Sequence, residues 1–164
     1  GMEALMSKRQ FWLFKSEPTA YSFRDLMEEE DQTAEWDGVR NYQARNLLRD
    51  EIKIGDGVLF YHSNSKPSAV VGTATVVSDG YADITAWDPN SKHPDLKSTS
   101  ENPIWFMVDI KADQTFQRVV SLREIKATAA LSDMVLVKNS RLSVQPVASD
   151  EFDLIVSMGM GDGR

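Results

Sequence analysis

The stretch FWLFKSEP, residues 11–18, joins a continuous apolar run to an abrupt cluster of polar residues. The run is rich in aromatic side chains, which is typical of a strand buried in a core, and Glu17–Pro18 ends it. Lys15, Ser16 and Glu17 would then emerge from the core at a strand end, a position that commonly holds a site. The alternative is an ion pair followed by a turn, without a ligand.

Further strands and short helices are predicted along the rest of the chain. Ser22 followed by Asp25, Asn41 ahead of an amphipathic run, and Ser121 each indicate a helix start. Gly72 indicates a bulge or a close approach inside a strand. The predicted strands lie within 54–64, 68–80, 104–111 and 115–120, and the predicted helices lie at 21–29, 41–50, 121–126 and 149–159, the last ending at Gly159.

This order of elements predicts an α+β, mostly β fold. Helices are too few for a doubly wound sheet, so a small, twisted barrel of about five to six largely antiparallel strands, flanked by short helices, fits best. A chain of 164 residues is one domain of ordinary size. We expect a single domain over 10–160, a tag remnant with a flexible N-terminus over 1–9, where Gly1 precedes Met2, and a flexible C-terminus over 161–164.

Composition excludes several classes of protein. There is no cysteine, which removes disulfide frameworks, thiolate zinc sites and cysteine nucleophiles. The two histidines, His62 and His93, are not spaced as a metal motif, so no metal and no cofactor is expected. Neither a bilayer-spanning run nor a hydrophobic signal core is visible. We therefore expect a soluble, cytoplasmic protein without a membrane partner, and a monomer is favoured.

The charges are unevenly distributed. The formal net charge of −7 argues against bulk attraction to nucleic acid. The acidic stretch 25–37 is nevertheless followed by Arg40, Arg45, Arg49 and Lys53, the last three of which would line one helix face. Such a stripe is either a phosphate-facing surface or a solvated helix face balanced by neighbouring acids, and the sequence favours neither.

Several aromatic and polar side chains occupy unusual positions. In AEWDGVRNYQARNLLRD, residues 34–50, Trp36 lies between two acids and just before Gly38, which allows a sharp turn. Trp87, in a long polar loop, raises the same question more weakly. Residues 58–67, VLFYHSNSKP, alternate, and one face is expected to be core. The two faces hold Leu59, Tyr61 and Ser63, and Phe60, His62 and Asn64. His62 is either a satisfied core histidine or part of a pocket wall.

Together these motifs resemble the EVE domain family, a branch of the PUA-like superfamily related to the YTH readers. The motifs that carry the resemblance are FWLFKSEP, WDGVRNYQARN, FYHSN, a G-x-A-x-V pattern from Gly72, DPNSK and NPIWFMVDI, and they span roughly residues 11–159. The resemblance implies a PUA-like pseudo-barrel that binds a modified base of DNA or RNA turned out into a pocket. It attaches no firm catalytic activity. The segment KHPDLKS departs from the family pattern at His93 and Leu96.

Under this interpretation the candidate residues take two roles. Trp36 would be the stacking plate, and hydrogen bonds to the base edge would supply selectivity. The candidate base-binding residues are Trp36, Ser16, Glu17, Asn41, Tyr61, His62, Ser63, Asn64 and Trp87. The candidate phosphate-binding residues are Lys15, Arg40, Arg45 and Arg49. No residue is predicted to be catalytic.

The alternative is a hydrolase similar to the ASCH domains, which are also PUA-like and include small amidohydrolases of acylated nucleosides. Lys15, Ser16 and Glu17 supply a lysine, a hydroxyl and a carboxylate. Adjacent strand residues point to opposite faces, however, and the ASCH pattern G-x-K-x-x-E-x-R is absent. A non-catalytic reader is therefore the favoured hypothesis.

Overall fold

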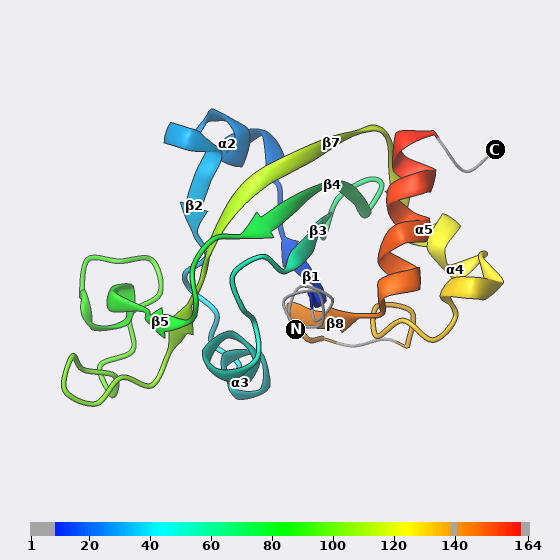
Figure 1. The fold of residues 1–164 in the computed structure, drawn as a ribbon. Helices are drawn as coiled ribbons and strands as arrows, with labels where there is room; N and C mark the ends of the chain where they lie inside the picture. Colours follow the sequence, from blue (N-terminus) through cyan, green and yellow to red (C-terminus); the bar gives the residue numbers. More distant parts are fainter. Residues whose placement is uncertain (1–8, 139–140, 162–164) are drawn as a thin grey trace, which may run out of the picture.

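A curled sheet of six strands organises the computed structural model, which describes residues 9–138 and 141–161 (Figure 1). The strand order is β2-β7-β4-β3-β1-β8, and only β1 and β3 pair in parallel among these strands. The strands are β1 (Phe11–Ser16), β2 (Thr33–Glu35), β3 (Gly57–His62), β4 (Ala69–Val76), β7 (Asp109–Ser121) and β8 (Val144–Val147). The predicted mostly antiparallel, barrel-like fold is confirmed. Of the predicted terminal segments 1–9 and 161–164, residues 1–8 and 162–164 lie outside the described residues.

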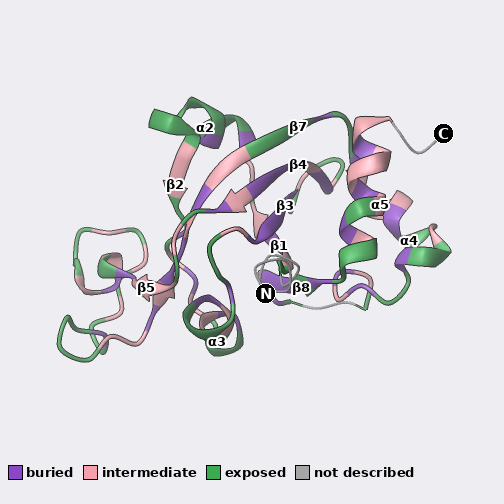
Figure 2. Ribbon diagram, in the orientation of Figure 1, coloured by how far each residue is buried: buried purple, intermediate pink, exposed green. Residues whose placement is uncertain are grey.

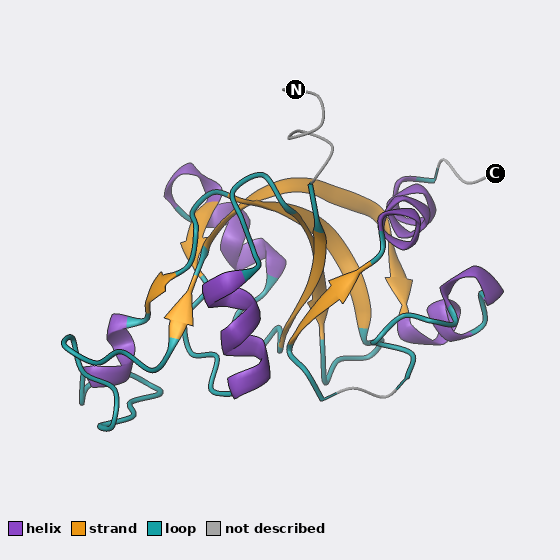
Figure 3. Cartoon of the chain, turned by 60° about the horizontal axis from the view of Figure 1, so that its bottom comes forward, coloured by secondary structure: helices purple, strands orange, loops and turns teal. Residues whose placement is uncertain are grey.

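Short helices and one small ribbon surround the sheet. Figure 3 shows the strands curling into an arch, with α3 and α5 at opposite sides of it. The α-helices are α2 (Phe23–Glu28), α3 (Tyr42–Asp50), α4 (Leu122–Lys126) and α5 (Ser149–Met160). The 3₁₀ turns are η1 (Glu30–Gln32), η2 (Ile84–Trp87) and η3 (Ala129–Leu131), and β5 (Tyr81–Ala82) pairs with β6 (Phe106–Met107). Within the described ranges, no helix combines the length and the apolar character that crossing a membrane requires.

The predicted helix starts are confirmed by their capping bonds. The Ser22 side chain accepts from the Asp25 amide, and the Asp25 carboxylate accepts from the Ser22 amide. Asn41 accepts from the Ala44 amide at the start of α3, and Ser121 caps α4 in the same way. Each side chain satisfies an amide that the helix itself leaves unpaired, so local sequence is sufficient to set these boundaries.

The sheet separates two apolar clusters, and both faces of its central strands are buried (Figure 2). On β1, Trp12 and Phe14 pack into the cluster that contains Trp36, whereas Leu13 packs into the cluster beneath α5. On β3, Phe60 and Tyr61 divide in the same way. The core face expected for this segment is present, and the other face of β3 is buried as well, because the sheet has an apolar cluster on each side.

Two predicted elements have different boundaries in the structure. Residues 115–120 belong to the 13-residue strand β7, which begins at Asp109, because β4 provides a continuous pairing partner through register shifts. Helix α5 continues past Gly159 to Met160 and ends at Gly161, whose φ of 77° is left-handed. The close approach predicted at Gly72 is confirmed, since a Cβ there would lie 2.6 Å from the Gln114 carbonyl oxygen.

Candidate ligand groove

A groove of about 830 Å³ opens where the end of β1, the segment after β2 and the loop after η2 meet. Its volume is in the range of small-molecule and cofactor pockets. Lys15, Ser16, Trp36 and Arg40 are the predicted site residues that line it. The other lining residues are Ala20, Tyr21, Glu29, Ala34, Glu35, Asp37, Gly38, Val39, Thr85, Ser91, Lys92, His93 and Ser143.

Trp36 is both a wall of this groove and a member of the core. Its side chain packs against Phe14, with ring centroids 5.3 Å apart, and edge-to-face against Phe60 at 5.4 Å. Its amide donates to the Val108 carbonyl, and the residue is 8% exposed. Trp36, which lies outside every strand and helix predicted from the sequence, therefore belongs both to the groove wall and to the core. The predicted turn after it is present, because Gly38 has a φ of 81°. The core holds the Trp36 ring in one orientation before any ligand arrives.

Beneath the groove lies the buried carboxylate of Asp83, which Arg40 neutralises. The two groups are 2.9 Å apart, and the Asp83 side chain is fully buried. Burial by itself would raise the pKa of Asp83, but hydrogen bonds from Thr85, from the Gly38 amide and from Arg40 hold that pKa below its ordinary value. The carboxylate thus stays charged and ties the groove's loops together.

Arg40 therefore has a structural role rather than the predicted phosphate-binding role. Its guanidinium also donates to the His93 carbonyl at 2.7 Å and to the Val39 carbonyl at 3.1 Å. These bonds, with those to Asp83 and Thr85, engage all three guanidinium nitrogens. A phosphate would have to displace these bonds, so we assign Arg40 to the support of the groove.

His93 and Asp37 form a polar wall of the groove. The His93 Nε2 lies 3.0 Å from the Thr85 hydroxyl and 3.6 Å from an Asp37 carboxylate oxygen. Burial, with a further contribution from the charge of Asp83, raises the pKa of Asp37. The His93 ring packs directly on Gly38, where a Cβ would lie 2.9 Å from it. The wall therefore presents an acceptor and a ring nitrogen at fixed positions.

The opposite wall combines the end of β1 with the start of the following loop. The Ser16 hydroxyl donates to the Tyr21 carbonyl at 2.6 Å, and the Tyr21 hydroxyl donates to Glu29 at 2.8 Å. Burial lowers the pKa of Lys15. Burial and the hydrogen bond to Glu29 raise the pKa of Tyr21 above its ordinary value. Lys15 lies at the groove's edge, at the end of the strand that the sequence predicted.

The remaining predicted base-binding residues do not line this groove; they are Glu17, Asn41, Tyr61, His62, Ser63, Asn64 and Trp87. The His62 ring accepts a hydrogen bond from the Phe23 amide at 3.0 Å and so caps α2. Of the two alternatives for His62, a histidine with its hydrogen bond satisfied inside the fold and a pocket wall, the structure favours the first. The Asn41 side chain caps α3, and Tyr61 packs into the cluster beneath α5. His62, Asn41 and Tyr61 therefore serve the fold, because each contacts a helix amide or the core.

Other candidate base-binding residues bond to one another or to the backbone outside the groove. Asn64 donates to the Glu17 carboxylate, and the Ser63 amide donates to the Ser16 carbonyl. These bonds join the ends of the parallel strands β1 and β3. The turn that the non-ligand alternative anticipated follows β1, where the Ala20 and Tyr21 amides donate to the Glu17 carbonyl. Trp87 closes η2 and is half-buried.

Arg45 and Arg49 lie on α3, away from the groove lining. Arg45 donates to the Ile104 carbonyl at 2.6 Å, and Arg49 pairs with Asp50 at 2.8 Å. The Arg49 pair is exposed, with side-chain exposures of 40% and 51%, and such pairs contribute little to stability. Arg49 could exchange this exposed contact for a phosphate at small cost.

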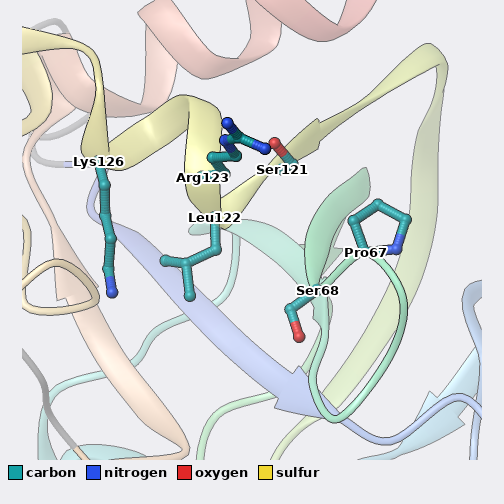
Figure 4. Close-up of a pocket in the computed structure, with 6 residues that line it drawn as sticks. All are labelled: Pro67, Ser68, Ser121, Leu122, Arg123 and Lys126. Carbon is teal, nitrogen blue, oxygen red and sulfur yellow. The ribbon is translucent and has the colours of Figure 1, made fainter.

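A second cavity, of about 450 Å³, lies between α4 and the segment before β4 (Figure 4). Arg123 and Lys126 give it a positive charge. Its hydroxyl groups are already engaged, because Ser121 caps α4 and Ser68 donates to the Ser65 carbonyl. Among the described residues, no aromatic side chain lines it. The groove beside Trp36 is therefore the stronger candidate site. No cluster of three or more potential metal ligands occurs among residues 9–138 and 141–161.

The fold and the groove can now be compared with known proteins. The EVE domain profile matches residues 10–158. The chain belongs to the EVE domain family. Human thymocyte nuclear protein 1 is 40% identical over 164 residues, covering 90% of this chain and 72% of that protein. A solved structure from Leishmania major is 43% identical, with a TM-score of 0.89, and covers 97% of this chain and 99% of that one.

Another solved structure of this family was determined with a ligand. It is human THYN1 protein in complex with 5-methylcytosine containing DNA, 38% identical to this EVE domain, with a TM-score of 0.86. The match covers 92% of this chain and 97% of that chain. By contrast, an ASCH protein from Zymomonas mobilis is 11% identical with a TM-score of 0.54, which indicates a shared fold alone.

Sequence reasoning missed part of the groove of this EVE domain. Asp37, Thr85 and Ser91 line it but were not among the predicted site residues. Asp37 and Ser91 lie within the family motifs WDGVRNYQARN and DPNSK, whereas Thr85 lies outside every quoted motif. For His93 the sequence did contain an indication, because the segment KHPDLKS departs from the family pattern at this residue. The missing information was the path of residues 83–103, which brings a distant loop against Gly38.

Proposed function

We propose that this EVE domain binds nucleic acid that carries a modified base, with the base turned out into the groove beside Trp36. The observation that supports this most strongly is a rigid aromatic wall next to a polar wall, in a space large enough for a base. The complex of human THYN1 with 5-methylcytosine containing DNA, from the same family, makes 5-methylcytosine in DNA the first ligand to test.

The energetics require both walls. Turning a base out of a duplex costs a few kcal/mol, and stacking on an aromatic ring returns about 1–3 kcal/mol. Stacking therefore offsets the cost without discriminating among bases. Discrimination comes from polar groups that a wrong base leaves unpaired. Asp37 and His93 take the roles of edge readers in this proposal, in place of the strand-end residues predicted from sequence.

Phosphate contacts would come from the cations in and beside the groove. Lys15 lines it, and Arg45 and Arg49 lie on the neighbouring helix. Few cations are involved and the chain is acidic overall, so the salt dependence of binding should be shallow. Exchanging both Arg45 and Arg49 for Glu should weaken the binding of all oligonucleotides about equally. It should also reduce the slope of log affinity against log salt concentration by roughly one to two units.

The test is a titration of the protein with matched oligonucleotides that contain 5-methylcytosine, cytosine or thymine at one position, in single- and double-stranded DNA and in RNA. We expect tighter binding of a strand with the modified base. Trp36→Phe keeps an aromatic wall, and Trp36→Ala removes it. Binding of the modified strand should survive the first change and fall by roughly 5- to 150-fold in the second, the equivalent of one stacked base.

Stability must be measured on the same variants because Trp36 also belongs to the core. Truncating a buried tryptophan costs about 3–5 kcal/mol of unfolding free energy. Affinity is therefore compared at a temperature where each variant is folded. Equal affinity for all three bases, or no loss in folded Trp36→Ala, would contradict the proposal.

The hydrolase alternative gains no specific support from the geometry. The Ser16 hydroxyl donates to a backbone carbonyl, and Glu17 accepts from Asn64 outside the groove, so the lysine, hydroxyl and carboxylate do not converge. Thr85 and Asp37 both approach His93 through the same ring nitrogen, which is not the arrangement of a nucleophile, base and orienting acid. Analysis of the oligonucleotides for product during the titrations tests this alternative directly.

A further inference from the structure

We propose that Tyr42 is a second stacking platform, which holds the base next to the one in the groove. The inference rests on the proposed function, since it places a neighbouring nucleotide of the same strand. Tyr42 is the first residue of α3, and it was not among the predicted site residues. Tyr42 lies in the segment RNYQAR, residues 40–45, of which only Arg40 lines the groove.

The Tyr42 ring is exposed and held from beneath. It is 58% exposed, and its ring centroid lies 4.8 Å from that of Trp105, with an angle of 32° between the planes. Trp105 is buried, and its indole N–H donates to Asp95 at 2.7 Å. One face of the tyrosine is thus fixed on a rigid support. Because Trp105 already orders the Tyr42 side chain, stacking of a ligand on the exposed ring costs little conformational entropy.

The charges around the ring indicate which occupant fits. The Arg45 guanidinium lies 5.1 Å from the Tyr42 ring centroid, and Arg49 lies 6.0 Å from that of Phe106. Aromatic rings interleaved with arginines bind bases by stacking and the attached phosphates by charge. An acidic chain that concentrates arginines and aromatic rings on this face is suited to a nucleic acid strand.

The platform is continuous with the groove. Arg40 lines the groove, and its guanidinium lies 5.6 Å from the ring centroid of Trp105, the ring that supports Tyr42. Arg40 and Tyr42 are only two residues apart, so their Cα atoms are separated by at most about 7 Å. A base in the groove and a base on Tyr42 can therefore belong to adjacent nucleotides of one strand.

The experiment removes each partner of the proposed stack in turn. A short single strand of DNA with one 5-methylcytosine is compared with strands in which the nucleotide on its 5′ side, or on its 3′ side, is abasic. One abasic strand should bind the unchanged protein roughly 5- to 150-fold more weakly than the intact strand. Tyr42→Ala should bind the intact strand more weakly than the unchanged protein does, by a similar factor. For that abasic strand, the affinities of Tyr42→Ala and of the unchanged protein should be nearly the same. Tyr42→Phe should bind like the unchanged protein.

The controls separate this proposal from the function on which it rests. Val119→Ala removes another exposed hydrophobic side chain, 43% exposed and on β7, and should leave binding unchanged. Melting of Tyr42→Ala should show an intact fold, because alanine suits a helix. Loss of affinity in Tyr42→Ala for methylated and unmethylated strands alike would support the platform even if the groove failed to prefer the modified base. Unchanged affinity, or an equal abasic effect with and without Tyr42, would overturn it.

Discussion

Arg40→Ala should destabilise this EVE domain because it leaves a buried carboxylate without its cation. Asp83 is fully buried, and in the variant it would retain only the neutral donors of Gly38 and Thr85. Removing one partner of a buried pair typically costs 3–5 kcal/mol. The Arg40 side chain is 21% exposed, so water can partly replace it and we expect about 3 kcal/mol. For a domain of this size that corresponds to a Tm lower by about 6–12 °C.

Denaturant unfolding with the matched variant Arg49→Ala provides the comparison. Arg49 makes a pair of similar length with Asp50, but both side chains are well exposed, so its loss should change the unfolding free energy much less than the loss of Arg40. In a double-mutant cycle, adding Asp83→Asn to Arg40→Ala should recover part of the lost stability, because the uncompensated charge is gone. Equal stabilities for the two arginine variants, with strand binding lost only in Arg40→Ala, would refute the structural role and restore Arg40 as a phosphate ligand.

Two further outcomes follow from the histidine at the start of α2 and the glycine in the groove. Burial lowers the pKa of His62 from 6.5, and its Nε2 must be unprotonated to accept from Phe23. The folded pKa is depressed, so its stabilising contribution is complete above 6.5 and declines as the pH falls below that value. Chemical unfolding across this range should show the decline, and His62→Gln should flatten it. Gly38→Ala should cost about 1–2 kcal/mol for its positive φ and displace His93, detected as a lower Tm and weaker strand binding; an unchanged Tm would contradict this.

Local sequence determined much of the secondary structure. Ser22, Asn41 and Ser121 cap the helices that they were predicted to start. The apolar run from residue 11 forms β1, and Gly72 lies at a close approach. These features depend on residues a few positions apart, or on steric limits that one residue type imposes by itself. They could therefore be predicted before any tertiary contact was known.

Prediction of the groove was less complete, since its walls come from segments far apart in the chain. Sequence alone identified Trp36 and Lys15 as site candidates, because an aromatic before a glycine turn and a cation at a strand end are visible locally. It also suggested His62 and Asn41, which have the right chemistry. Their side chains instead accept from helix amides that lie within reach. A polar side chain's partner is decided by which donor comes closest, and sequence spacing does not reveal that for distant elements.

The sequence by itself determined the strand and helix pattern, the acidic charge with its local arginines, and the motifs of the family. Only the tertiary structure placed His93 against Gly38, paired Arg40 with the buried Asp83 and set Tyr42 on Trp105. The physical reason is the range of the interactions. Capping, turns and apolar periodicity act over a few residues, whereas charge compensation and ring stacking join residues that only the folded chain brings together.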